Sequence, residues 1–272
     1  MLVLSLFPGI GLLDMAFETE GFCVVRGPDV LWGGNVRRFH PPAAKFDGVI
    51  GGPPCQMFSP LAHMVRHNGH EPKFGNLIPE FERCVSEARP QWFLMENVPQ
   101  APVPIVPGYD VYSYILNNRQ CLDENGEPAK QNRVRRFSWG WKGEGRPPLL
   151  IDVTVWENAE FEYAACGGSQ GSSLGAAGWD GGTKESRKLR KEQRLNSCVG
   201  FNVKSQSLFA RLCELQGLPP DLLKDAPFTV AAKCKAVGNG VPLPMGRAIA
   251  KAVREAVEVF RKRLNAETID YC

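Results

Sequence analysis

The sequence has no uninterrupted apolar stretch that approaches the roughly 18–20 residues a membrane-spanning helix requires. Its nine cysteines are odd in number and include no C-x-x-C pair, which does not suit a disulfide framework. No internal repeat is visible, and no basic leader precedes Pro8, so we expect no secretory signal. The net charge is only +3, which by itself names no polyanionic partner. These absences predict a cytoplasmic protein with reduced thiols and no membrane association.

Short apolar runs stand out in the first third of the 272-residue chain, which is 43% hydrophobic. The runs are Leu2–Phe7, Phe22–Val25, Phe46–Ile50 and Trp92–Met95. Runs of this length without polar alternation suit strands that are buried on both faces of a parallel sheet. Helices between them, one of which we place at Ile78–Ala88, would supply the crossover connections. We therefore predict an α/β fold of the nucleotide-binding type, with helices on both faces of the sheet.

The clearest helix of the sequence lies near its end. Pro244 suits a first helical turn, and apolar residues then recur at i, i+3, i+4 and i+7 from Met245 to Phe260. Lys and Arg gather toward its C-terminal end, where the helix dipole favours positive charge. A helix with such an apolar face needs a sheet to cover, so we expect it to pack back onto the first domain.

Residues 138–204 differ in composition from the rest of the chain. They combine a Gly/Ser-rich segment at 167–182 with a basic run from Lys184 to Arg194. The tryptophans scattered through this region are Trp139, Trp141, Trp156 and Trp179. Composition leaves two interpretations open: a surface insertion with solvated charges, or a small module that touches phosphates. We treat 138–204 as a small region of its own and assign 1–137 and 205–272 to one main domain.

Two candidate catalytic side chains follow predicted strands. Cys55 lies in a rigid Gly-Gly-Pro-Pro turn directly after Phe46–Ile50, and Glu96 directly follows Trp92–Met95. Ligands of open α/β sheets bind beyond the C-terminal ends of the strands, so the two side chains can share one cleft. A thiol there can act as a nucleophile, and a carboxyl can protonate or hydrogen-bond a ring nitrogen. The alternatives are a buried structural cysteine and a capping glutamate.

A glycine turn follows the first predicted strand. In Phe7-Pro8-Gly9-Ile10-Gly11, the glycines let the backbone approach a nucleotide-like ligand, although any tight strand-to-helix turn would look similar. Three of the four histidines, His63, His67 and His70, lie together in the segment 57–75. Only Glu71 accompanies them at ligand spacing, so we predict no metal site.

Taken together and in this order, these segments resemble the C5-cytosine DNA methyltransferases. Phe7–Gly11 is similar to the first cofactor motif of that family, Gly52–Gln56 to its nucleophile motif and Glu96–Val98 to its glutamate motif. Three further similarities lie at Gln131–Arg135, Arg211–Pro219 and Val237–Pro242. Six motifs in the family's order are far more specific than any one of them. The resemblance implies a Rossmann-like methyltransferase fold, a catalytic domain formed by 1–137 and 205–272, and a target-recognition region at 138–204.

The resemblance also implies a reaction. The family flips a cytosine out of double-stranded DNA and methylates its C5 atom with S-adenosylmethionine. Cys55 would attack C6 while Glu96 holds or protonates N3, and Arg133 and Arg135 would orient the flipped nucleotide and its phosphates. Loss of the C5 proton and expulsion of the thiol would then release 5-methylcytosine. The other residues expected to contact DNA are Gln56, Ser59, Asn97, Gln131, Lys188 and Arg190.

The resemblance places S-adenosylmethionine against eight residues. They are Phe7, Gly9, Gly11, Asp29, Asn35, Pro53, Asn239 and Val241. The chain departs from the family after the second strand, where the helix between the ribose-binding and adenine-binding positions is missing. Asp29 is the local candidate for the ribose, and Asn35 stands where the family has an aspartate. The amide oxygen of an asparagine can still accept from the adenine amino group.

Three other functions stay open at the level of sequence. The altered ribose and adenine positions also suit a cytosine-C5 modification with an unusual one-carbon donor. The basic, tryptophan-containing region permits structured RNA as the substrate. A non-catalytic DNA-binding homologue is the third. We expect a monomer that acts in the cytoplasm of a bacterial or phage-infected cell, in restriction–modification or phage biology.

Overall fold

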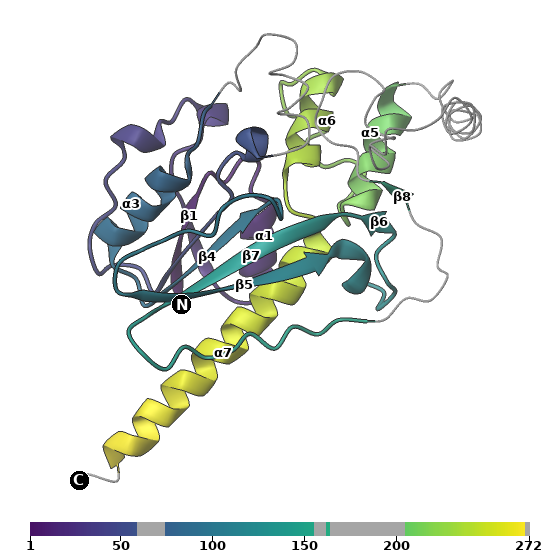
Figure 1. Ribbon diagram of the computed structural model, residues 1–272. Coiled ribbons are helices and arrows are strands. Elements are labelled where there is room, and N and C mark those ends of the chain that lie inside the picture. Colours follow the sequence, from purple (N-terminus) through teal and green to yellow (C-terminus); the bar gives the residue numbers. More distant parts are fainter. Residues whose placement is uncertain (59–73, 155–161, 164–204, 270–272) are drawn as a thin grey trace, which may run out of the picture.

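A six-stranded sheet forms the centre of the computed structural model, which describes residues 1–58, 74–154, 162–163 and 205–269 (Figure 1). The strands lie in the order β2-β1-β3-β4-β7-β5. Their bounds are β1 Leu2–Leu6, β2 Cys23–Arg26, β3 Gly48–Gly51, β4 Trp92–Asn97, β5 Tyr109–Asn117 and β7 Val134–Lys142. The first four are parallel, whereas β7 is antiparallel to both of its neighbours. The predicted parallel α/β core is confirmed, and the hairpin of β5 and β7 extends it.

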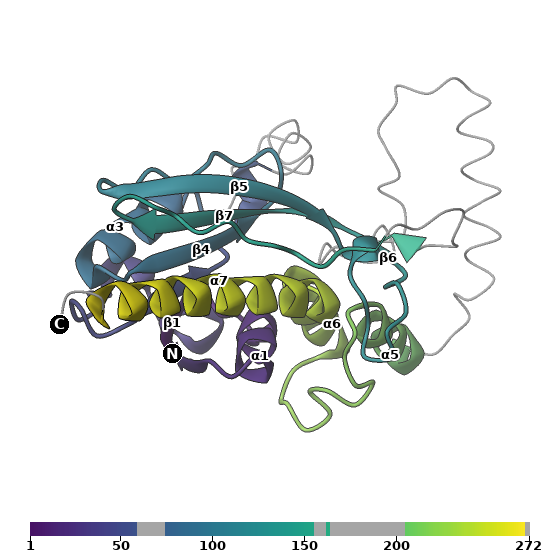
Figure 2. The ribbon, with the colours of Figure 1, turned by 90° about the horizontal axis from the view of Figure 1, so that it is seen from below.

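Helices cover both faces of this sheet (Figures 1 and 2). On one face α3 (Ile78–Ala88) packs against side chains such as Val49. On the other face α1 (Leu12–Thr19) and α7 (Leu243–Ile269) pack with the adjacent residue Ile50. Successive side chains of a strand point to opposite faces, so the apolar run in β3 contributes side chains to the hydrophobic cores on both faces of the sheet. This is why the strand reads as uniformly apolar.

The C-terminal helix packs back onto the first part of the chain, as its pattern predicts. Met245, Ile249 and Val253 of α7 are fully buried and share one core with Trp92 and Trp139. Figure 2 shows α7 running beneath the sheet, past α1 and β4. Two shorter helices, α5 (Ser205–Leu215) and α6 (Val230–Asn239), precede it, and a two-stranded piece is formed by β6 (Gln131–Asn132) and β8 (Glu162–Tyr163).

The central sheet continues past residue 138, where we expected the separate region to begin. β7 runs to Lys142, and the rings of Trp139 and Trp141 are buried in the main core with exposures of 0% and 1%. Aromatic side chains of this size bury too much apolar surface to be left on a loose insertion. The remainder of the expected recognition region, apart from residues 143–154 and 162–163, lies outside the described residues.

The second strand and the segment that follows it also differ from a regular α/β unit. β2 is an edge strand, and Val25 is 41% exposed rather than buried on both faces. Two single-turn helices, η1 (Val30–Trp32) and η2 (Val36–Arg38), follow it where a full crossover helix would stand. This agrees with the missing helix that the sequence indicates. Within the described ranges, every helix is too short or too polar to span a bilayer.

Candidate active site

The candidate site lies at the C-terminal edge of β3 and β4. Cys55 begins the single-turn helix η3 (Cys55–Met57), which follows β3 through the Gly52–Pro54 turn. Glu96 lies at the end of β4, inside the strand rather than just beyond it. The next residue, Asn97, is 2% exposed and donates from its side-chain amide to the Pro53 carbonyl at 3.1 Å. Asn97 therefore braces the turn from within, whereas we expected it to face DNA.

The structure brings the predicted catalytic side chains together around the Cys55 thiol. Burial raises the pKa of this thiol, and the negative charge of Glu96 raises it further. The guanidinium groups of Arg135 and Arg133 act in the opposite direction and lower the same pKa. Cys55 itself is half-buried, so the sulfur is neither sealed in the core nor freely solvated. The pKa of the Cys55 thiol thus responds to the other three candidate catalytic residues, Glu96, Arg133 and Arg135.

Glu96 and Arg135 form an ion pair that fixes the carboxylate. Arg135 Nε lies 2.9 Å from Glu96 Oε1, and their side chains are only 16% and 13% exposed. Glu96 is opposite Phe137 in the antiparallel β4–β7 pair, so Arg135 is its diagonal neighbour on the same face. A Cβ added at Gly52 would lie 3.0 Å from Glu96 Oε2, so the absence of a side chain at Gly52 makes room for the carboxylate.

Arg133 holds a different part of the site. It is 4% exposed, and its Nη1 donates to the Gly238 carbonyl at 2.7 Å. The adjacent Asn239 ends α6, and Gly240 packs so closely on Leu12 that an added Cβ would lie 2.4 Å from Leu12 Cδ1. The segment carrying Asn239 and the buried Val241 therefore lies directly against the start of α1, beside the glycine turn.

The glycine turn after β1 has the backbone geometry of a ligand cradle. Phe7, Gly9 and Gly11 all adopt positive φ, at 57°, 57° and 83°. Apart from its two chain neighbours, no atom of the described residues would lie within 4 Å of a Cβ added at Gly9, so these residues leave space next to that backbone. Asp29 accepts from the Gly9 amide at 2.9 Å and from the Leu31 amide at 2.7 Å. Asp29, the residue predicted to bind the ribose, thus lies at the turn and helps to fix its conformation.

Two features of this cradle were missed from the sequence. Trp32 is 62% exposed, donates from Nε1 to the Gly9 carbonyl at 2.8 Å and contacts the Phe228 ring. The second feature is Asp14, a fully buried carboxylate that accepts from Ser5 Oγ at 2.5 Å and pairs with Arg26 at 3.0 Å. Burial raises the pKa of Asp14, against the lowering effects of Ser5 and Arg26. The only signal in the sequence is a charged residue on an otherwise apolar stretch of helix.

The remaining predicted site residues divide into three groups. Gln56 lies in η3 beside Cys55, and Asn35 is exposed, with its side chain accepting from the Arg37 amide at 3.0 Å. Gln131 is fully buried, so it does not reach the surface where we expected a DNA contact. Ser59, Lys188 and Arg190 lie outside the described residues, as do the three histidines of segment 57–75. In the part of the chain that the structure describes, no cluster of three His, Cys, Asp or Glu could hold a metal ion.

Known proteins resemble this chain in sequence. Residues 35–102, which include Cys55 and Glu96, match the family of C-5 cytosine-specific DNA methylases. The Type II methyltransferase M.FnuDI of Fusobacterium nucleatum is 33% identical over 192 residues, which are 60% of this chain and 51% of that protein. The Type II methyltransferase M.AquIA of Picosynechococcus is 35% identical over 124 residues, 35% of this chain and 48% of that one. The chain spans about half the length of these relatives.

Solved structures resemble it in fold. A DNMT2 variant of Spodoptera frugiperda aligns with a TM-score of 0.58 at 15% identity, over 92% of this chain and 98% of that one. The methyltransferase EhMeth of Entamoeba histolytica aligns with a TM-score of 0.56 at 11% identity, over 94% and 98% of the two chains. The predicted Rossmann-like methyltransferase fold is confirmed, and so is the resemblance to the C5-cytosine DNA methyltransferase family.

Proposed function

We propose that this protein methylates C5 of cytosine in double-stranded DNA, with S-adenosylmethionine as the methyl donor. The observation that carries the proposal is the Cys55 thiol beside the Glu96–Arg135 pair, at the C-terminal edge of β3 and β4. All but Arg135 lie in the segment that matches the C-5 cytosine-specific methylases. A target base inside a duplex must be flipped out before any side chain reaches its ring.

The residues divide the work on the flipped base. The Cys55 sulfur, as the thiolate, forms a bond to C6, and the ring electrons move toward C5 and N3 as Glu96, in its protonated form, gives its proton to N3. Arg135 holds the Glu96 carboxylate in place through the 2.9 Å ion pair. After C5 has gained the methyl group, the C5 proton leaves to a base and its electrons re-form the C5–C6 double bond. The Cys55 thiolate is expelled in the same step.

S-adenosylmethionine fits the cradle after β1 in its chemistry. Open space beside the Gly9 backbone admits a ligand, and the Asp29 carboxylate can accept hydrogen bonds from ribose hydroxyls. When bound, this donor supplies the methyl group. Asn239 and Val241 border the same turn through the contact of Gly240 with Leu12, which supports their assignment to the donor site. Phe7, Gly11, Asn35 and Pro53 complete the proposed set.

Incubation with labelled S-adenosylmethionine and mixed-sequence DNA tests the proposal. Nucleoside mass spectrometry should detect 5-methylcytosine, and Cys55→Ala should abolish it. Cys23→Ala is the matched control, because Cys23 is an exposed free cysteine at the other end of the sheet strands. No product on any DNA, or full product from Cys55→Ala, would contradict the proposal. A different C5 substituent would favour an unusual donor, and product on RNA alone would favour an RNA substrate.

The partner and setting follow from the same resemblance. We propose duplex DNA as the partner, with residues 138–204 reading the target and Lys188 and Arg190 contacting phosphates. The relatives named above are Type II methyltransferases, which favours a role in restriction–modification or in a phage. A cytoplasmic location and a monomeric state complete the proposal, and sedimentation of the purified protein tests the latter.

A further inference from the structure

The segment between β2 and β3 has little regular structure to hold its own conformation. It joins two parallel strands, and its helices are the single turns η1 and η2. Most residues from 29 to 40 are exposed, and Val36 is the one buried side chain among them. Helices of one turn are unstable by themselves because nucleation is costly. The conformation of this segment therefore depends on contacts with the rest of the molecule.

The start of the segment is anchored to the donor cradle. Asp29 accepts from the Gly9 amide, and Trp32 donates from its indole to the Gly9 carbonyl. The chain then folds back, because the Gly34 amide donates to the Asp29 carbonyl at 2.8 Å. The fold is tight, since a Cβ added at Gly34 would lie 2.8 Å from the Asp29 nitrogen. Asn35, the next residue, is thereby kept close to the cradle.

The other end of the segment is held by Arg83 of α3. Arg83 Nη2 donates to the Val36 carbonyl at 2.8 Å and to the Phe39 carbonyl at 3.0 Å. Glu80 and Glu87, one turn before and one turn after it on α3, pair with its Nε at 2.9 Å and its Nη1 at 2.7 Å. The two carboxylates orient the planar guanidinium, which then ties both ends of η2 to α3.

The same turn fixes the side-chain amide of Asn35. Its Oδ1 accepts from the Arg37 amide at 3.0 Å, and its carbonyl accepts from the Arg38 amide at 3.1 Å. The Arg37 amide can bond only to the oxygen end of the Asn35 side chain, so an intact η2 sets which way that side chain faces. An amide oxygen has two lone pairs, so Oδ1 can accept a second bond from a ligand.

We propose that Arg83 is a positioning residue for the adenine end of the donor site. By holding η2 against α3, it keeps Asn35 Oδ1 turned toward the purine as an acceptor. A 6-amino purine donates to that oxygen, whereas a 6-oxo purine places a second acceptor there and leaves both unpaired. The inference rests on the proposed function, because it requires S-adenosylmethionine in the cradle.

Two ligands that differ at the purine 6-position test this role by calorimetry on the full-length protein. The wild type should bind S-adenosylhomocysteine at least about tenfold more tightly than S-inosylhomocysteine. Arg83→Lys keeps the positive charge beside Glu80 and Glu87, but its ammonium lacks the planar fork that reaches both carbonyls, so the preference should fall below about threefold. Arg254→Lys is the matched control and should keep the preference, because Arg254 pairs with Glu20 on the face of the sheet opposite α3.

Hydrogen exchange in the unliganded protein tests the contact itself. The Arg38 and Phe39 amides are bonded within η2, and in Arg83→Lys they should exchange at least about tenfold faster, while the amides of β1 stay unchanged. Unchanged exchange would show that Arg83 does not hold η2. An unchanged preference between the two ligands would overturn the role of Arg83 in donor binding and leave the proposed function intact. No binding of either ligand by the wild type would overturn the proposed donor and this inference with it.

Discussion

The Cys55 thiol carries two opposed electrostatic influences. Burial and the Glu96 carboxylate raise its pKa, while Arg135 and Arg133 lower it. The net shift is upward, so the resting thiol is protonated at neutral pH and becomes a thiolate only as the pH rises. Alkylation of Cys55 by iodoacetamide should therefore be slow at pH 7 and should accelerate by about tenfold per pH unit below the pKa.

Removing the Glu96 charge should separate thiol reactivity from catalysis. Glu96→Gln removes one cause of the raised pKa, so alkylation of Cys55 at pH 7.5 should become several-fold faster, whereas methyl transfer should fall. Peptide mass spectrometry measures the first quantity at Cys55 alone. Glu80→Gln, which removes an ion-paired carboxylate on α3, should leave the alkylation rate unchanged. An unchanged or slower alkylation rate in Glu96→Gln would show that the Glu96 charge does not raise the pKa of this thiol.

The missing side chain at Gly52 makes room for the Glu96 carboxylate. Gly52→Ala would place a methyl group 3.0 Å from Glu96 Oε2, and apart from its chain neighbours the Glu96 carbonyl oxygen is the only other atom of the described residues within 4 Å of it. We expect the carboxylate to shift, the methylation rate to fall by about tenfold or more, and the melting temperature to stay nearly constant. In a Glu96→Gln background the same change should cost little further activity. A large loss of stability would show that Gly52 serves folding instead.

At the scale of elements, glycine and aromatic residues pair across strands. Gly48 of β3 is opposite Trp92 of β4, and Gly140 of β7 is opposite Phe93. In each pair the ring lies over the glycine, because an added Cβ would come within 2.2 Å or 2.1 Å of a ring carbon. The strands are thus held by rings that occupy the space a side chain would take, as cross-strand pairs stabilise sheets generally.

Gly140→Ala should strain this packing. The Phe93 ring is fully buried between Phe81 and Tyr109, at centroid distances of 5.8 Å and 5.4 Å, so it has little room to move away. We expect the free energy of unfolding in urea to fall by about 1–3 kcal/mol. Phe93→Leu removes the ring, so Gly140→Ala should cost markedly less in that background. Additive effects of the two substitutions would show that the ring is not the obstacle.

The sequence predicts those elements that are apolar on both faces or periodic over several turns. The helix Ile78–Ala88 and the four parallel strands meet this condition, and the structure contains them. The hairpin of β5 and β7 does not, because β5 lies at the edge and mixes exposed Tyr112 and Ile115 with buried positions. The sequence pattern therefore assigns the tryptophans of β7 to the insertion. Only the folded sheet shows that they are core residues.

The candidate site shows the same division. Cys55 and Glu96 follow strands, so their shared edge is predictable from the topology of a parallel sheet. The pairing of Glu96 with Arg135 depends on the β4–β7 register, and the burial of Asn97 and Gln131 depends on contacts distant in sequence. A motif states which residue types a reaction needs. It does not state which of them turn inward to support the others.

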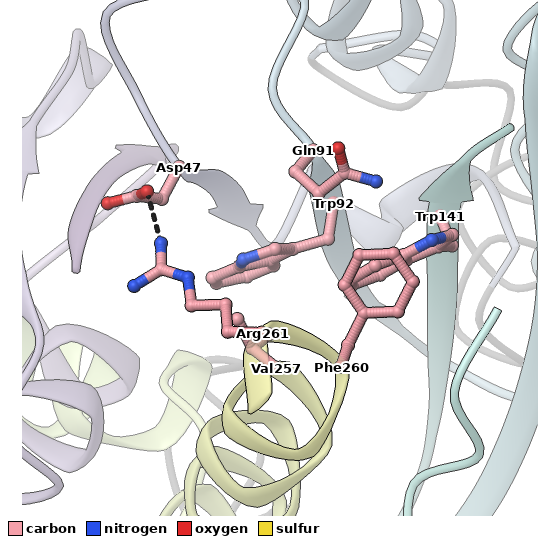
Figure 3. A pocket seen from close by; sticks show the side chains of 7 residues that line it. All are labelled: Asp47, Gln91, Trp92, Trp141, Val257, Phe260 and Arg261. Carbon is pink, nitrogen blue, oxygen red and sulfur yellow. Dashed lines mark hydrogen bonds and ion pairs between the residues drawn. The ribbon is translucent and has the colours of Figure 1, made fainter. Parts of the chain in front are cut away.

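At the scale of the whole molecule, α7 joins the two edges of the sheet. Its first turn lies against α1, because a Cβ added at Gly246 would lie 2.8 Å from Ala16 Cβ, and α1 follows the glycine turn of the donor cradle. Its distal part reaches the opposite edge, where Phe260 packs on Trp141 and Arg261 pairs with Asp47 (Figure 3). The helix therefore contributes to both edges, but through different turns. Shortening it from the end should separate the two contributions.

Two truncations test this separation. A chain that ends after Val257 loses Phe260 and Arg261, and with them the ring contact and the ion pair at the distal edge. We expect its melting temperature to fall by about 5–10 °C, because burying an aromatic side chain contributes a few kcal/mol to a domain of this size. A chain that ends after Arg263 keeps both contacts and should melt within about 2 °C of the full chain. Because residues 239–241 remain in both, calorimetric affinity for S-adenosylmethionine should change less than threefold, and a large loss in either folded truncation would show that the distal turns of α7 also support the donor cradle.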